Sequence, residues 1–206
     1  MPEPSTTMRT PAFFDTAPRI VMQDPLAEFL GAAAAGVIEY SYLDAVKLAG
    51  HSCPTVAEAY LMTRAALARL YPGEHPRRGE VRVELRQALD EGVAGVIAGV
   101  AGLITGAAGA GGFKGLAGRH ARRNLLHFNV PMQGTMRFTR LDSGRSVEAA
   151  PHDAVPRSPA LMGLLQAALD PAAGASARQA FADAWQDRVR LLLETADDPA
   201  WAGAPH

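Results

Sequence analysis

Residues 42–54, YLDAVKLAGHSCP, set the predicted fold of this chain. Apolar side chains recur near one face of the segment Tyr42–Ala49, which predicts a short helix, and Gly50 is a typical residue to end it. Pro54 suits the first position of a second helix, which the apolar spacing extends to about Tyr71. The GHSC turn therefore connects two predicted helices.

Helix and strand patterns alternate outward from this pair of helices. Residues 80–85 alternate apolar and charged side chains, as a strand with one solvent-facing side does. Residues 92–112 form an uncharged run rich in Gly and Ala, which predicts a helix followed by a loop. The other predicted strands are Val37–Tyr40, 125–130, 135–141 and Ser146–Ala149, and the other predicted helices are 25–30, Pro159–Leu169 and 176–195.

This order of elements predicts an α+β fold. We expect a central, mostly antiparallel sheet packed with helices, in a single domain with a C-terminal helical extension. The expected parts are a flexible N-terminal lead-in at residues 1–23, an α+β domain at 24–150, a linker at 151–159, and C-terminal helices at 160–206 that pack on the domain. A length of 206 residues suits one substantial domain.

The composition excludes several classes of protein. An apolar fraction of 48% with 20% charged residues is sufficient for a buried core, so global disorder is excluded. A formal net charge of −1 is not that of a polycation, so we expect no nucleic-acid partner. Cys53 is the single cysteine, which excludes an internal disulfide and any multi-cysteine zinc or iron–sulfur site.

Two segments bear on membranes and location. Residues 1–9 are polar and lack the basic and then apolar pattern of a signal peptide, so a cytoplasmic protein is expected. Residues 92–112 are long enough to span a bilayer, but they hold few large apolar side chains and their transfer energy is weak. We therefore expect no membrane partner, and we expect the small residues to let this helix pack closely on a sheet or on its twin in a second copy.

His51 and Cys53 are the sharpest chemical feature, because they place the only thiol two residues from an imidazole. Cys53 lies at the start of a predicted helix, and helix N-termini stabilise anions such as a thiolate. A thiolate and a neutral imidazole suit zinc, nickel, copper or haem iron. The pair also suits a cysteine nucleophile with a histidine base. The simplest alternative is a small buried side chain beside a hydrogen-bonded histidine.

A basic segment at residues 113–124 holds four cations and one histidine, without an acidic residue. It follows a glycine-rich stretch with accessible backbone amides, which predicts a site for a small anionic ligand such as a phosphate, a carboxylate or a haem propionate. A solvated basic face is the alternative. The candidate cofactor-binding residues are Lys114, Arg119, Arg122 and Arg123.

A third metal ligand would come from the distant part of the chain. His127 lies in a predicted strand, and His120 lies in the basic segment just before it. We take His127 as the candidate third ligand beside His51 and Cys53. The alternative is that both histidines are structural, since a histidine in a strand is commonly packed or hydrogen-bonded.

The sequence of residues 42–54 resembles the opening of the E-subunit family of formylmethanofuran dehydrogenase, whose hallmark is Gly-His-x-Cys-Pro-Gly followed by a long helix. The similarity extends over residues 24–141, through the next strand and the Gly/Ala-rich helix. The resemblance implies an α+β fold and a bound transition metal, often zinc, with His51 and Cys53 as ligands. Thr55 replaces the family's glycine after Cys-Pro, and the cysteine-rich C-terminal zinc module is missing, as in a short bacterial member.

Three functions follow as expectations. The first is a protein that binds a metal or metallocofactor through His51 and Cys53: zinc foremost, nickel or iron next, and haem as the alternative, with its propionates on the basic segment. Two donors are incomplete for a structural zinc site, so water, His127, His120 or a second copy of the chain would supply the rest, and a homodimer is expected. The second function is a small enzyme that acts on an anionic molecule through a metal-bound water or the Cys53 thiolate. The third is an interaction protein that dimerises through its Gly/Ala-rich helix.

Overall fold

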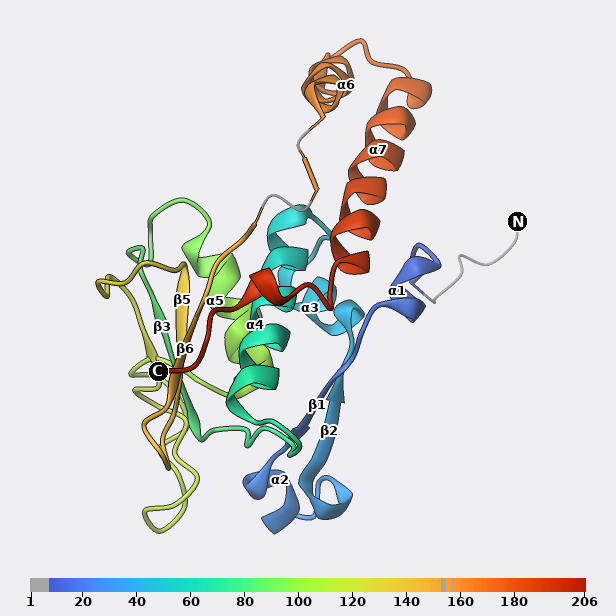
Figure 1. Cartoon of the computed structure of the whole chain (residues 1–206). Helices are drawn as coiled ribbons and strands as arrows, with labels where there is room; N and C mark the ends of the chain where they lie inside the picture. The colour runs from blue at the N-terminus through green and yellow to red at the C-terminus, as the bar shows by residue number, and fades with distance from the viewer. Residues whose placement is uncertain (1–7, 153–154, 157) are drawn as a thin grey trace.

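The computed structural model describes residues 8–152, 155–156 and 158–206 and has an α+β fold (Figure 1). The predicted class and the mostly antiparallel sheet are confirmed. The helices are α1 (Phe13–Thr16), α2 (Pro25–Phe29), α3 (Tyr42–Ala49), α4 (Pro54–Leu70), α5 (Ala94–Thr105), α6 (Pro159–Leu169) and α7 (Ala175–Glu194), with 3-10 turns η1 (Ala34–Gly36) and η2 (Pro199–Trp201). The strands are β1 (Ile20–Gln23), β2 (Val37–Tyr40), β3 (Val81–Leu85), β4 (Leu126–His127), β5 (Met136–Arg140) and β6 (Ser146–Ala149).

The α3–α4 pair forms as the sequence predicts. Ser41 and Asp44 make a capping box at the start of α3, in which each side chain bonds the other residue's backbone N–H. Gly50 ends α3 in the left-handed conformation, with φ of 76°. Cys53 is the N-cap residue of α4, and Pro54 occupies the first helical position. The GHSC turn is therefore held between two fixed helix ends.

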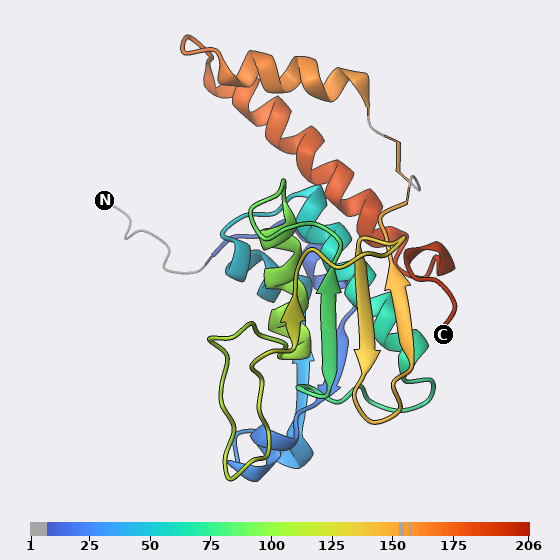
Figure 2. The same cartoon turned by 90° about the vertical axis from the view of Figure 1, so that its left-hand side faces the viewer.

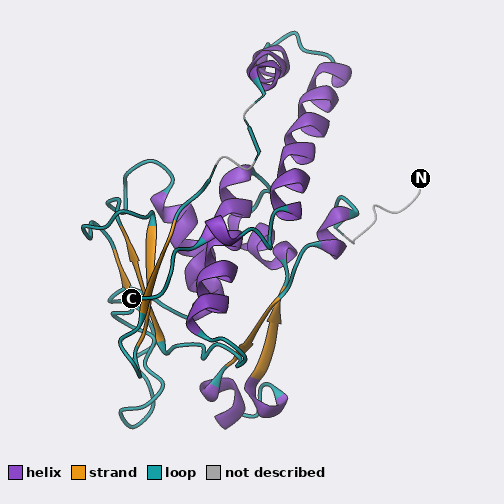
Figure 3. Ribbon diagram, viewed as in Figure 1, coloured by secondary structure: helices purple, strands orange, loops and turns teal. Residues whose placement is uncertain are grey.

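The main sheet has the strand order β4-β3-β5-β6, in which only the β3–β4 pair is parallel. Its inner face is apolar, and the cross-strand row Val83, Phe138 and Val147 is fully buried. Helices α4 and α5 pack on this face, as Figure 3 shows by element type. The outer face carries charged pairs, including Arg137 with Glu148 at 2.9 Å. This alternation is the pattern predicted for β3.

Strand β4 is shorter than the predicted strand over residues 125–130. Asn124 and Asn129, which flank it, both have positive φ values, of 58° and 57°. Left-handed residues break an extended backbone, so the regular pairing with β3 is limited to Leu126–His127. Beyond Asn129, the Val130 N–H again donates to the Leu85 carbonyl oxygen of β3.

The prediction that residues 1–23 form a flexible lead-in is wrong for residues 8–23, the part that the structure describes. Residues Phe13–Thr16 form α1, and Ile20–Gln23 form β1, which pairs antiparallel with β2. Phe14, Ile20 and Met22 are buried in the core. Proline and charged residues interrupt this stretch, so its short apolar alternation gives little signal on its own.

The glycines of α5 all face parts of the same chain. An added Cβ at Gly99 would meet the Leu48 side chain of α3, whereas one at Gly102 would meet the carbonyl oxygen of Ala107. The helix packs against α3, α4 and β3, and most of its residues are buried. Gly95 is exposed and Gly99 and Gly102 are only partly buried, so the homodimer contact expected through this helix stays a prediction.

Only 12 residues of the uncharged 92–112 run are helical. No helix in the described part of the chain combines the length and the hydropathy needed to cross a membrane.

The C-terminal helices form a hairpin that projects from the body (Figures 1 and 2). Helix α7 packs on α4 through buried residues near its C-terminal end, as predicted. Helix α6 packs mainly on α7 and has no buried residue, so the prediction that both helices pack on the domain is wrong for α6. The chain then returns to the body, where Trp201 is fully buried. The last residues pair with β6: the Gly203 N–H donates to the Glu148 carbonyl oxygen at 2.9 Å.

Candidate functional site

The GHSC turn exposes its histidine and buries its cysteine. His51 is exposed, and its Nδ1 lies 2.9 Å from the carbonyl oxygen of Ala49. Because a carbonyl only accepts, Nδ1 carries a proton, and in the neutral ring Nε2 is then the acceptor. Cys53 is 8% exposed and contacts the hydrophobic core. The pair therefore has one solvent-facing nitrogen donor and one sulfur at the edge of the core.

Ser52, between these two residues, ties the turn to helix α7. Tyr42 Oη donates to Ser52 Oγ at 3.0 Å, and Ser52 Oγ donates to Gln186 Oε1 at 2.9 Å. The Ser52 carbonyl oxygen accepts from Gln186 Nε2 at 3.1 Å and from Trp185 Nε1 at 3.2 Å. Burial raises the pKa of Tyr42 above its usual range, so this hydroxyl remains a donor at neutral pH.

The tie to α7 was not predicted from the sequence. It joins residues that are more than 130 positions apart in the sequence. The only local indication of it is that Trp185 and Gln186, two adjacent residues of the predicted helix, both carry side-chain N–H donors.

The three predicted metal ligands do not come together within one chain. No group of three His, Cys, Asp or Glu side chains in the described residues is arranged to hold an ion. His127 lies on β4, the edge strand of the main sheet, and its Nε2 lies 2.9 Å from the Asn124 carbonyl oxygen. His120 stacks on Phe29 of α2, with ring centroids 5.8 Å apart. Neither histidine completes a site at the GHSC turn.

The basic segment is divided between the interior and the surface. Arg122 is buried and bonds Asp24, whereas Lys114, Arg119 and Arg123 are exposed and form no ion pair within the described residues. Arg122 is thus not a surface residue of the basic segment: its Nη2 bonds Asp24, and its Nε and Nη1 are buried without a hydrogen-bond partner among the described residues. The segment lies beside α2, and the GHSC turn lies beside α7, at the other end of the body (Figure 2). A haem whose propionates reach the basic segment is not supported within one chain.

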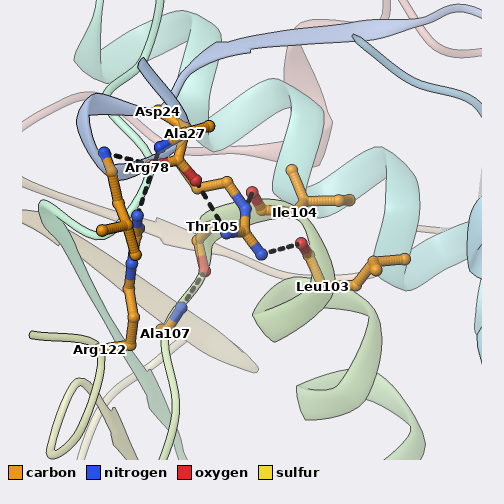
Figure 4. A network of polar contacts seen from close by, with 9 residues as sticks. Asp24, Ala27, Arg78, Leu103, Ile104, Thr105, Ala107 and Arg122 are labelled. Carbon is orange, nitrogen blue, oxygen red and sulfur yellow. Dashed lines mark hydrogen bonds and ion pairs between the residues drawn. The ribbon is translucent and has the colours of Figure 1, made fainter. Parts of the chain in front are cut away.

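Asp24 is the centre of a buried ion network (Figure 4). Its Oδ1 accepts from Arg122 Nη2 at 2.6 Å, and its Oδ2 accepts from Arg78 Nη1 at 3.0 Å. Oδ1 also caps α2 by accepting from the backbone N–H groups of Leu26 and Ala27. Burial alone would raise the pKa of Asp24, but the Ala27 N–H and the two guanidinium groups outweigh it and lower that pKa below its usual value.

Arg78 connects this network to the end of α5. Its Nη2 and Nε donate to the carbonyl oxygens of Leu103 and Ile104, at 3.0 Å and 3.2 Å. These are carbonyls that a helix C-terminus leaves without intrahelical partners. The network thus fixes α2, α5 and the basic segment to one another, which is a structural role.

Two cavities adjoin the helices around the turn. One, of about 430 Å³, lies between α4 and the C-terminal residues, and its Arg64 side chain is bonded to Ala196 and Asp197. The other, of about 310 Å³, lies between the start of α4 and the α6–α7 hairpin, next to the GHSC turn. The second cavity has mainly apolar walls, which is typical of sites for small molecules.

A comparison of the chain with protein-family models and with curated proteins finds no match.

Proposed function

We propose that this protein binds one transition-metal ion, zinc foremost, at an open site in which His51 and Cys53 are the two protein ligands. Exchangeable molecules such as water take the remaining positions. The proposal agrees with the resemblance of residues 42–54 to the E-subunit family of formylmethanofuran dehydrogenase, because the motif of that family contains the His and the Cys that correspond to His51 and Cys53.

The orientation of the His51 ring carries this proposal. Metal-bound histidines commonly donate their second ring N–H to a carbonyl or carboxylate, which fixes the tautomer. His51 Nδ1 makes this contact with the Ala49 carbonyl oxygen, 2.9 Å away. Nε2 of an exposed side chain then presents its lone pair outward, as a neutral imidazole ligand requires.

Cys53 is the second ligand in this proposal. Cys53 occupies the N-cap position of α4, but its side chain makes no hydrogen bond to the backbone N–H groups of the helix. The sulfur therefore has no capping role. A closed structural zinc site has four protein ligands, and the described residues of one chain supply no third. Two protein donors leave at least two positions of a tetrahedral zinc ion to exchangeable molecules, one more than in the three-ligand open sites of zinc enzymes.

The alternative of a Cys53 nucleophile uses the same two residues. The burial of Cys53 restricts the access of a substrate and of a metal ion alike, so it does not separate the two alternatives. His51 Nδ1 is bonded to a backbone carbonyl, so a base within reach of the thiol would have to be Nε2. The cytoplasmic location expected from the sequence remains a prediction.

Isothermal titration of Zn²⁺ into the untagged, metal-stripped protein tests the proposal. We expect one zinc per chain, and we expect His51→Ala and Cys53→Ala each to abolish this stoichiometric binding. His127→Ala is the matched control, because His127 is also exposed and also has one ring nitrogen on a backbone carbonyl. This control should bind zinc as the natural chain does.

Each other result rejects the proposal. Full binding in both the His51 and the Cys53 variants would show that the ion is held elsewhere. Loss of zinc binding in His127→Ala would show that His127 is a ligand together with His51 and Cys53. One zinc per two chains, with a dimer by light scattering, would show a site shared between two copies, in which the second chain supplies the remaining ligands.

A further inference from the structure

The cavity between α4, α6 and α7 has no role in the proposed metal site. Its volume is about 310 Å³, and Pro54 and Thr55 form the part of its wall next to the GHSC turn. The α6–α7 hairpin forms the opposite part. We propose that this cavity binds an uncharged small molecule with two fused aromatic rings. This inference does not rest on metal binding.

The apolar walls come mainly from the C-terminal hairpin. Leu161, Met162 and Leu165 of α6 line the cavity, and Trp185 of α7 supplies an aromatic face. Helix α6 has no buried residue although it carries no charged side chain, so its apolar surface is incompletely covered by the rest of the chain. A ligand in the cavity would cover part of this surface.

The aromatic wall is already fixed in place. Trp185 Nε1 donates to the Ser52 carbonyl oxygen at 3.2 Å, which fixes one edge of the indole ring. Phe181 contacts the same ring, with centroids 5.3 Å apart. A wall held in this way loses little conformational entropy when a ligand binds against it.

The volume limits the size of the ligand. A dry cavity of about 150 Å³ accommodates benzene, so a cavity of twice that volume accommodates two fused rings. Aromatic ligands also suit Trp185, because offset or edge-to-face ring pairs add to the energy of apolar burial.

The charged groups on the wall limit the ligand's charge. Arg188 and Glu58 line the cavity with one charge of each sign. Arg188 Nη1 is bonded to the carbonyl oxygens of Val155 and Pro156, at 2.9 Å and 2.7 Å, so the guanidinium group is anchored. The attraction of a charged ligand to one group is offset by its repulsion from the other, so the cost of removing the ligand's charge from water is not repaid, whereas a neutral ligand has no such cost.

Isothermal titration with 1-naphthol, an uncharged two-ring aromatic at neutral pH, tests the inference. Leu165→Trp should fill the cavity and weaken binding by at least about tenfold, which corresponds to 1.4 kcal/mol. Leu169→Trp is the matched control, because Leu169 is on the same helix, is 71% exposed and does not line the cavity. This control should bind 1-naphthol as the natural chain does.

A second cavity-filling variant and two charged ligands complete the test. Met162→Trp is a second filling variant, for use if Leu165→Trp loses its circular dichroism spectrum. Anionic 1-naphthoate and cationic 1-naphthylmethylamine should each bind at least about tenfold more weakly than 1-naphthol.

The inference is overturned if 1-naphthol does not bind, if it binds equally to both filling variants, or if either charged probe binds as well. Light scattering gives the remaining result that would overturn it: a dimer that becomes a monomer on Leu165→Trp would show that α6 of a second copy fills the cavity.

Discussion

Ser52 fixes the GHSC turn through hydrogen bonds to residues that are distant in the sequence. Its hydroxyl and carbonyl groups together make four hydrogen bonds, one to Tyr42 and three to adjacent residues of α7. These bonds hold the backbone between His51 and Cys53, so the metal ligands that we propose stand on a rigid base. Rigid support of this kind is what a precise site requires.

At the same scale, Asp24→Asn tests the buried ion network. Asn retains an oxygen that can cap α2 but leaves two arginines without a counter-charge. We expect the free energy of unfolding to fall by about 3–5 kcal/mol at pH 7, as for other broken buried ion pairs. Urea denaturation measures this difference.

The pH dependence of that difference follows from the lowered pKa of Asp24. The unfolded carboxyl has a pKa of roughly 3.9, so the stabilisation by the Asp24 charge is fully present above about pH 5. It is lost as the pH falls through the lower pKa of the folded state. A gap between the natural chain and Asp24→Asn that stays constant down to pH 2 would contradict this account.

Two glycines with the same backbone conformation should respond differently to alanine. Gly50 and Gly79 have φ values of 76° and 83°. Nothing lies near an added Cβ at Gly50, whereas one at Gly79 would overlap the Arg122 guanidinium group. Gly50→Ala should cost only the strain of the left-handed conformation, about 1–2 kcal/mol. Gly79→Ala should lower the free energy of unfolding clearly more than Gly50→Ala, because it also displaces Arg122 from Asp24. Equal decreases in urea denaturation would show that Arg122 moves away without a loss of stability.

At the scale of elements, the longer helices and the strands β2 and β6 form where the sequence predicts them, whereas β1 and the shortness of β4 are not predicted. Asp24, Ser41 and Gly50 mark helix ends through local chemistry, and the structure places caps at all three. Strand β1 depends on pairing with β2 across an intervening helix, which a four-residue pattern does not reveal. The Asp24–Arg122 pair spans 98 residues, so no local pattern indicates that one arginine of the basic segment is buried.

The glycines of α5 provide a matched test of its packing. Gly99→Ala would place a Cβ at ordinary contact distance, 3.7 Å from Leu48, and should raise the free energy of unfolding by up to about 1 kcal/mol through helix propensity. Gly102→Ala would place a Cβ 2.9 Å from the Ala107 carbonyl oxygen, which is too close, and should lower the free energy of unfolding. Thermal and urea denaturation of both variants check the signs, and a loss of stability in Gly99→Ala would show that α3 leaves no room for the added methyl group.

At the scale of the whole molecule, the C-terminal region has two parts with different roles. The last residues return to the body, where Trp201 Nε1 donates to the Thr195 carbonyl oxygen at 3.0 Å and the ring contacts His152. The α6–α7 hairpin projects outward (Figure 1). Its residues also line the cavity beside the GHSC turn. The sequence indicates the hairpin through two periodic segments, but the terminal residues have no periodicity that would predict their burial.

Substitutions of Trp201 and Trp185 test separately the burial of the last residues and the attachment of the α6–α7 hairpin. Trp201→Ala removes a fully buried side chain and should cost about 3–5 kcal/mol of unfolding free energy. Trp185→Ala removes a half-buried side chain and one hydrogen bond, so it should cost less while releasing the GHSC turn from α7. Urea denaturation of the two variants gives the comparison, and a larger loss for Trp185 would show that the hairpin is integral to the core.

The absorption spectrum of the Co²⁺-substituted protein tests the central claim most directly. Cobalt replaces zinc in tetrahedral sites, and only a bound thiolate produces sulfur-to-cobalt charge transfer. The account predicts this band in the natural chain and in His127→Ala, its absence in Cys53→Ala, and no stoichiometric cobalt binding in His51→Ala. A spectrum without charge transfer in the natural chain would show that Cys53 is only a core residue, and it would contradict the proposed site.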